Sequence, residues 1–136
     1  MRYLPDIADT SGTGINGRVE AQVTQADTAQ TLGSGDVPVL GTPRVLALAE
    51  AATVSALTRR IETRFTSVGT RVELRHLAAT RLGTTVWAEA VLRERDGNRL
   101  VFDVRVIDDA DRVIAEGMLE RALIDREEFM SRVDGA

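Results

Sequence analysis

The chain has 136 residues, of which 43% are hydrophobic and 28% are charged, and its formal net charge is −4. This length suits one domain with its own core, and the composition is that of a globular protein. Its acidic balance argues against a nucleic-acid partner, because binding the phosphate backbone needs a basic surface. No apolar run is long enough to cross a bilayer, so we expect no membrane partner.

Two residue counts limit the possible chemistry. The sequence has no cysteine and one histidine, which excludes disulfides and a thiolate nucleophile and argues against a transition-metal site built by the protein. We therefore expect neither a metal nor a cofactor. The start of the chain has acids and a proline where a signal peptide would need an apolar segment. This predicts a cytoplasmic protein.

The first third of the chain predicts a leader, a strand and a short helix. Residues 1–15 show no periodicity, which favours a flexible leader before a single domain at 16–136. Residues 18–24 alternate between apolar and polar side chains, as in a strand with one buried face. Residues 24–32 can form a short helix capped by Thr24 or Asp27, which the glycines and polar residues after it would end.

The segment from Gly41 to Arg60 predicts the central helix of the fold. Thr42 followed by Pro43 is typical of a helix start, with the threonine as N-cap. From Val45 to Leu57 the side chains are apolar on every face of a helical wheel, which predicts burial all round. The exception is Glu50, and an ionised group is seldom buried without a partner or a function.

The rest of the chain predicts four consecutive strands. Residues 71–80 alternate, and His76 falls on the apolar face of that strand. Asp96 and Gly97 form a two-residue hairpin signal. Gly117 suggests a bulge or a close backbone approach. The expected strands cover residues 71–80, about 86–93, 99–107 and 112–124, and a helical turn over 125–133 ends the chain.

This order predicts an α+β hotdog fold, in which an antiparallel β-sheet wraps around one long central helix. A meander with alternating faces needs an apolar object to cover, and the helix over 41–60 is that object. One such layer leaves a sheet edge and part of the helix uncovered. We therefore expect a homodimer, or a larger homo-oligomer built from dimers.

Three residues stand apart from the packing pattern as candidates for chemistry. Thr42 is either an N-cap alone or a hydroxyl at a helix end whose free N–H groups can hold an oxyanion. Glu50 is either a carboxylate that lies at a dimer seam or pairs with an arginine, or a general base. His76 is either a hydrogen-bonded core residue or half of an acid–base pair. Helix geometry places Glu50 roughly 12 Å along the axis from Thr42, too far for direct contact.

Three segments of the sequence resemble the fluoroacetyl-CoA thioesterase family of hotdog hydrolases. They read VLGTPRVLALAEAA, SVGTRVELRHLAATRLGTTVWAEAVLRERDGNRL and EGMLERALIDREEF, and the resemblance extends from about Gly17 to Val133. It implies a catalytic set of Thr42, Glu50 and His76. It also implies that the backbone of Gly69 and the side chain of Arg121 contact the substrate or CoA.

The resemblance predicts an acyl-CoA thioesterase that hydrolyses a small acyl-CoA thioester. The fluoroacetyl-selective member of the family has phenylalanines before the central helix, whereas residues 33–40 here contain no aromatic side chain, so we do not expect fluoroacetyl selectivity. The phosphates of CoA need cations, and the candidates are Arg71, Arg75, Arg81 and Arg121. Two alternatives remain open: an acyl thioester hydratase, and a non-catalytic module that binds acyl-CoA or another small ligand.

Overall fold

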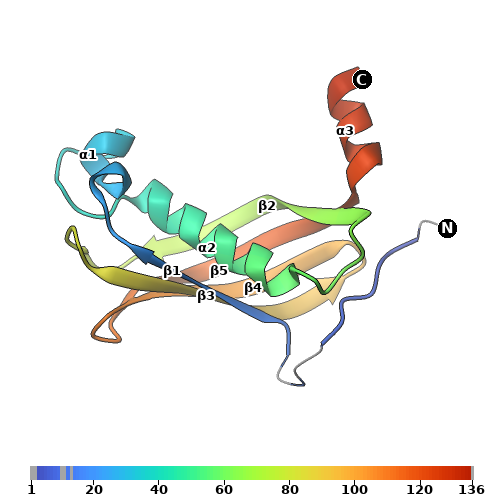
Figure 1. The fold of residues 1–136 in the computed structure, drawn as a ribbon, viewed down its shortest axis with the longest axis horizontal. Helices are drawn as coiled ribbons and strands as arrows, with labels where there is room; N and C mark the ends of the chain where they lie inside the picture. Colours follow the sequence, from blue (N-terminus) through green and yellow to red (C-terminus); the bar gives the residue numbers. More distant parts are fainter. Residues whose placement is uncertain (1–2, 10–11, 13, 136) are drawn as a thin grey trace.

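The computed structural model describes residues 3–9, 12 and 14–135, which form one sheet with a long helix against it (Figure 1). The strands are β1 Asn16–Gln22, β2 Phe65–His76, β3 Thr85–Asp96, β4 Arg99–Asp108 and β5 Val113–Asp125. The helical segments are the 3₁₀ turn η1 Gln25–Asp27, α1 Ala29–Leu32, the long α2 Thr42–Leu57 and α3 Arg126–Gly135.

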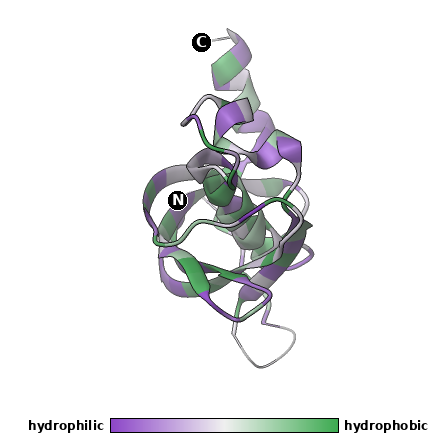
Figure 2. Cartoon of the chain, turned by 90° about the vertical axis from the view of Figure 1, so that its left-hand side faces the viewer, coloured by the Kyte–Doolittle hydropathy of each residue, from purple (hydrophilic) through white to green (hydrophobic). Residues whose placement is uncertain are grey.

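The five strands form one antiparallel sheet in the order β1-β3-β4-β5-β2. The sheet curls around α2, which lies against one of its faces (Figure 2). This is the hotdog arrangement predicted from the alternating strands and the apolar helix. Both β1 and β2 are edge strands of the sheet, so each leaves backbone groups on one side without a strand partner within this chain.

The core lies between α2 and the inner face of the sheet. Phe102, Leu100 and Val106 on β4 are fully buried beneath the helix, and α2 packs mainly over β1, β3 and β4. The contacting face of α2 is made of small residues, and Ala52 and Ala56 are 0% exposed. Small side chains let the helix backbone approach the strands closely, which sets the depth at which the N-terminus of α2 sits.

The prediction that the central helix is buried all round is wrong for a single copy of the chain. Val54 is 48% exposed, and Ala47 and Ala51 on the same face are also exposed. Because α2 covers the β1, β3 and β4 side of the sheet, its opposite flank has no strand over it. An exposed apolar flank on a helix whose other faces are buried in the core is typical of a surface that another molecule covers.

Several element boundaries differ from those predicted. Strand β1 lies two residues earlier than predicted, and the helix predicted over 24–32 is divided into η1 and α1, with Thr28 as the N-cap of α1. Strand β2 begins at Phe65 instead of residue 71, because an irregularity in its pairing with β5 between Gly69 and Arg71 interrupts the alternation by which strands are recognised. The β3–β4 turn residues are Gly97 and Asn98 rather than Asp96 and Gly97, since Asp96 still pairs with Arg99.

The first residues of the chain contact the domain. The Tyr3 hydroxyl donates to Glu62 at 2.5 Å, Arg95 donates to the Pro5 carbonyl at 2.6 Å, and the Ala8 N–H donates to the Arg60 carbonyl at 2.9 Å. Flexibility of this leader stays a prediction, as does a cytoplasmic location; residues 1–2, 10–11 and 13 lie outside the described part. Within that part, no helix is long and apolar enough to span a bilayer.

Candidate functional site

The N-terminus of α2 is capped by Gly41 and not, as predicted, by Thr42. Thr42 is the first residue inside the helix, and no side chain caps this end. The Gly41 carbonyl instead accepts from the Arg44 and Val45 N–H groups, while its own N–H donates to the Asp27 carbonyl. Because the backbone makes the cap, the Thr42 hydroxyl is free to bind elsewhere at the positive end of the helix.

The Thr42 hydroxyl lies against the imidazole of His76. Its Oγ1 is 2.8 Å from His76 Nδ1, although the two residues are 34 positions apart in the chain. His76 is the last residue of β2, and pairing of this residue with Ala115 on β5 fixes its backbone. The structure therefore joins two of the three predicted catalytic residues in one hydrogen bond, whose direction depends on the tautomer of the imidazole.

The second ring nitrogen of His76 has no hydrogen-bond partner among the described residues. This Nε2 atom is buried although the ring as a whole is only partly so. Burial lowers the pKa of the His76 imidazole, which favours the neutral form at neutral pH. A neutral imidazole that contacts a hydroxyl through one nitrogen and has the other unpaired is suited to proton transfer.

A hollow of about 330 Å³ opens beside Thr42 and His76, and we call it the α2 hollow. Its walls come from α1, the segment before α2 and the segment after β2. Apart from Thr42, Ser34 and His76, they are glycine and apolar residues: Ala29, Val39, Leu40, Gly41, Leu77, Ala78 and Ala79. No aromatic residue lines it, so its width is set by small and aliphatic side chains.

Glu50 lies away from this pair in the same chain. Its carboxylate rests on Gly69 of β2, where an added Cβ would come within 2.7 Å of Glu50 Oε2. The Glu50 side chain is 41% exposed, so the buried carboxylate expected from the apolar run is in fact half open to solvent. The structure thus forms two clusters, Thr42 with His76 at one end of α2 and Glu50 with Gly69 further along it.

Arg121 on β5 belongs to the second cluster and is almost fully buried. Its Nε donates to Ser67 Oγ at 2.7 Å, its Nη2 donates to the Ser67 carbonyl at 3.0 Å, and its Nη1 lies 3.5 Å from Glu50 Oε2. Burial lowers the pKa of the Arg121 guanidinium, and the Glu50 carboxylate opposes that shift. All three nitrogens are thus engaged by protein groups. The predicted contacts of Gly69 and Arg121 with the substrate stay predictions.

Ser67 is a member of this cluster that the sequence did not single out. It lies two residues before Gly69 on β2, and its hydroxyl and carbonyl both bind Arg121. Serine is common in exposed strand ends, so its residue type carried no signal. The Ser67 and Arg121 side chains meet because the register of β2 and β5 places Gly69 opposite Arg121, and the sequence alone does not give this register.

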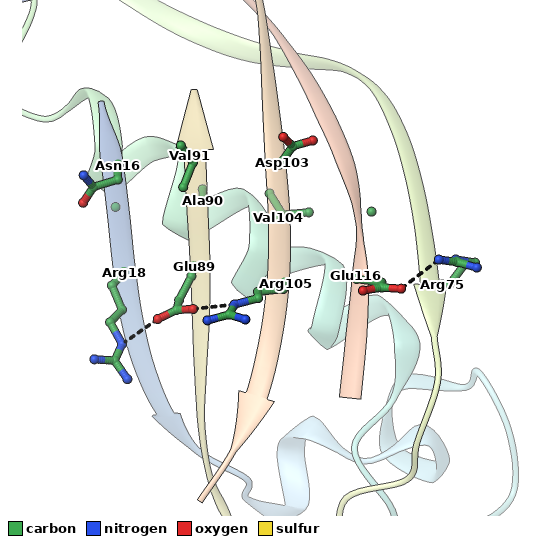
Figure 3. A pocket seen from close by; sticks show the side chains of 12 residues that line it. Asn16, Arg18, Arg75, Glu89, Ala90, Val91, Asp103, Val104, Arg105 and Glu116 are labelled. Atoms are coloured by element: carbon green, nitrogen blue, oxygen red, sulfur yellow. Dashed lines mark hydrogen bonds and ion pairs between the residues drawn. The ribbon is translucent and has the colours of Figure 1, made fainter. Parts of the chain in front are cut away.

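A larger hollow of about 660 Å³ lies on the opposite face of the sheet, with α2 behind the strands (Figure 3). Five charged residues face one another across it in strand register: Arg18, Glu89, Arg105, Glu116 and Arg75. Glu89 is paired with Arg18 and Arg105, and Glu116 is paired with Arg75. Both carboxylates of this set are held in ion pairs, whereas the α2 hollow has a hydroxyl in contact with an imidazole, so the chemistry is better placed at the α2 hollow.

Comparisons with known proteins show which family this chain resembles. A family model described as fluoroacetyl-CoA-specific thioesterase matches residues 23–127. The fluoroacetyl-CoA thioesterase of Streptantibioticus cattleyicolor is 38% identical over 95 residues, which are 70% of this chain and 68% of that protein.

Solved structures of similar proteins give the same result for the fold. A structure of the fluoroacetyl-CoA thioesterase FlK is 32% identical, with a TM-score of 0.80, and the match covers 88% of this chain and 93% of that one. Mutants of FlK have been solved with fluoroacetate and CoA and with acetyl-CoA. A thioesterase superfamily member from Thermus thermophilus shares the fold at 24% identity and a TM-score of 0.81, covering 98% of this chain and 93% of that one.

Proposed function

The chain belongs to the fluoroacetyl-CoA-specific thioesterase family, and we propose that it is a thioester hydrolase that cleaves small acyl-CoA thioesters to a free acid and CoA. The observation that carries the proposal is the 2.8 Å contact between the Thr42 hydroxyl and His76 at the N-terminus of α2. A hydroxyl next to a neutral imidazole, beside an apolar hollow and at a positive helix end, is a constellation suited to acyl transfer.

In the proposed reaction, the Thr42 oxygen attacks the carbonyl carbon of the thioester. His76 Nδ1 takes the hydroxyl proton and passes it to the sulfur of CoA as the carbon–sulfur bond breaks. A water molecule then attacks the carbonyl carbon of the acyl–Thr42 ester while His76 takes its proton. As the bond from this carbon to the Thr42 oxygen breaks, His76 returns the proton to that oxygen and the acid is released. The N-terminus of α2 and the Gly69 N–H of a second copy of the chain are the candidate donors for the oxyanion, which such groups stabilise by a few kcal/mol.

The position of Glu50 supports a homodimer in which the site is shared. Thr42 and Glu50 are separated by roughly 12 Å along the helix axis, and His76 and Gly69 by roughly 23 Å along β2. Glu50 is therefore too far from the His76 of its own chain to bind its imidazole. The His76 Nε2 atom, which is buried and unpaired among the described residues, is the group that a carboxylate from a second copy can satisfy.

The free edge of β2 gives a specific way to bring these groups together. If β2 pairs with the β2 of a second copy about a two-fold axis between Val72 and Glu73, His76 comes to lie opposite the partner's Gly69. The partner's Glu50 rests on that glycine and reaches the site beside His76. The same pairing covers the exposed flank of α2 at Ala47, Ala51 and Val54, as an isologous interface should.

In this assembly Arg121 acts as a positioning residue. Its side chain is buried, with Ser67 accepting two of its hydrogen bonds, and its remaining donor faces Glu50. A guanidinium held in this way fixes the position of the carboxylate. We therefore infer that Arg121 positions Glu50 and that a different cation binds the phosphates of CoA.

The walls of the α2 hollow bear on the acyl group. Small and aliphatic side chains line it, and residues 33–40 contain no aromatic side chain that could cover a fluoroacetyl group. We propose a short acyl-CoA without fluoroacetyl selectivity as the substrate class.

The experiment that tests the function is thiol release from a panel of short and medium acyl-CoAs, with acetyl-CoA and fluoroacetyl-CoA included. We expect hydrolysis of at least one short acyl-CoA by the wild type and no preference for fluoroacetyl-CoA. Binding of an acyl-CoA without thiol release would instead identify a non-catalytic module. Addition of water to an unsaturated acyl-CoA without loss of the thioester would identify a hydratase.

A further inference from the structure

Arg81 differs from most arginines of the chain because its guanidinium has no protein partner. Among the arginines that the structure describes, only Arg59 and Arg81 have side chains that make no hydrogen bond, ion pair or ring contact. The other arginines predicted as candidates for CoA binding are engaged: Arg71 pairs with Glu73, Arg75 pairs with Glu116, and Arg121 is buried against Glu50 and Ser67. An exposed, unpaired guanidinium has donors available for an anion.

Arg81 is also held at a fixed place near the Thr42 and His76 pair. Its backbone forms an antiparallel bridge with Val39, and the Thr80 carbonyl accepts from the Leu40 N–H at 2.9 Å. Val39 precedes Thr42 by three residues, a span of about 10 Å at most. Arg59, by contrast, follows the far end of α2, roughly 25 Å from Thr42 along the helix axis.

A second hollow, which we call the Arg81 hollow, adjoins the α2 hollow. It has a volume of about 430 Å³, and Val39 and Ala79 line both. Thr80 also lines it and is 3% exposed, with a buried hydroxyl that has no hydrogen-bond partner among the described residues. An unsatisfied buried hydroxyl in a wall favours a polar occupant over an apolar one.

The other charges of the Arg81 hollow are one ion pair and one further acid. Asp108 is neutralised by Arg112, whose Nε lies 3.1 Å from Asp108 Oδ2, and the Ala110 and Arg112 N–H groups also bind this carboxylate. These contacts hold the pKa of Asp108 below its ordinary value. Asp109 is the remaining acid in the lining and weakens the attraction for an anion.

We propose that the phosphates of CoA bind at Arg81, with the pantetheine arm passing from the Arg81 hollow over Val39 and Ala79 into the α2 hollow. This inference rests on the proposed function, because it places the CoA part of the same substrate. The distance from Arg81 to Thr42 is one that the extended pantetheine arm of CoA can bridge. Arg81 is thus the residue that distinguishes a CoA thioester from a simple thioester with the same acyl group.

The test compares Arg81→Gln with wild type on three thioesters of one acyl group: the CoA thioester, the dephospho-CoA thioester and the N-acetylcysteamine thioester. We expect KM for the CoA thioester to rise about three- to tenfold with kcat retained, as for loss of one exposed charge-assisted contact. The N-acetylcysteamine thioester, which has no phosphate, should be unaffected. A smaller effect on the dephospho-CoA thioester than on the CoA thioester would assign Arg81 to the 3′-phosphate, and an equal effect would assign it to the pyrophosphate.

Two further variants separate this site from general electrostatics. Arg75→Gln removes the same charge from the opposite face of the sheet and should leave KM for the CoA thioester unchanged. Asp109→Asn removes the opposing acid and should lower that KM, by up to about threefold. An unchanged KM in Arg81→Gln, or an equal rise on the N-acetylcysteamine thioester, would overturn the proposal. Since that last substrate reports hydrolysis alone, its turnover by wild type shows independently whether the proposed function holds.

Discussion

Replacing His76 by alanine is expected to reduce kcat for acyl-CoA hydrolysis by about 10²- to 10⁴-fold, the usual contribution of a positioned general base. The reason is its contact with Thr42: without the imidazole, no described group within hydrogen-bond distance of the Thr42 hydroxyl can take its proton. Thiol release under saturating substrate measures the effect, and free imidazole added to the variant should restore part of the rate.

The control for this variant is Arg75→Ala, one residue earlier on β2. The Arg75 side chain is exposed and pairs with Glu116 on the face of the sheet away from α2. Its loss should leave kcat within about twofold of wild type, because an exposed ion pair contributes little to stability. If His76→Ala retained most of its activity while folded, His76 would be a packing residue and the proposed base would be wrong.

Gly17→Ala is expected to destabilise the fold by about 3 kcal/mol or more, the upper range for overpacking a core. Gly17 lies on β1 directly beneath α2, and a Cβ there would come within 2.3 Å of the Ala52 carbonyl oxygen and 2.4 Å of the Ala56 nitrogen. Neither backbone atom can move unless the helix lifts from the sheet. Thermal unfolding should show a fall in Tm of roughly 10 °C.

The matched control is Gly135→Ala near the end of α3, where an added Cβ meets no atom within 4 Å. This variant should unfold within about 0.5 kcal/mol of wild type, as is usual for surface substitutions. Equal stability of both variants would show that α2 does not approach β1 as closely as described. Because the N-terminus of α2 carries Thr42, Gly17→Ala should also lower activity if it folds.

The sequence predicted the fold well because its strands alternate and its helix is apolar. The β3, β4 and β5 segments each bury one face, so their period of two was visible without a structure. Burial of α2 was overestimated, since an apolar helix face looks the same whether the chain itself or another molecule covers it. The early start of β2 was missed because the irregularity at Gly69 breaks the alternation.

The candidate site was predicted by residue type but not by arrangement. Glu50 and His76 were conspicuous because each is polar on an otherwise apolar face, and Thr42 because it precedes a proline at a helix start. Their grouping depends on where α2 crosses β2, which no local pattern encodes, and the structure joins Thr42 to His76 while it places Glu50 beside Gly69.

For the arginines, too, the sequence indicated the candidates but not their contacts. Four were equal candidates from the sequence, and cross-strand register decided which of them have partners. Arg75 pairs with Glu116 because the two are opposite each other on β2 and β5, whereas Arg81 follows the strand and has no such neighbour.

We propose that two copies of the chain share each thioesterase site, and dimers that combine two different variants test this sharing. His76→Ala and Glu50→Gln should each be nearly inactive as purified homodimers. Co-expressed, they should form heterodimers in which one of the two sites has an intact His76 and an intact Glu50 from opposite subunits. Random pairing then predicts about a quarter of the wild-type thiol-release rate. A mixture no more active than its separate components would contradict the shared site. If each site were built from one chain alone, one site of the heterodimer would lack His76 and the other would lack Glu50, so neither would be active.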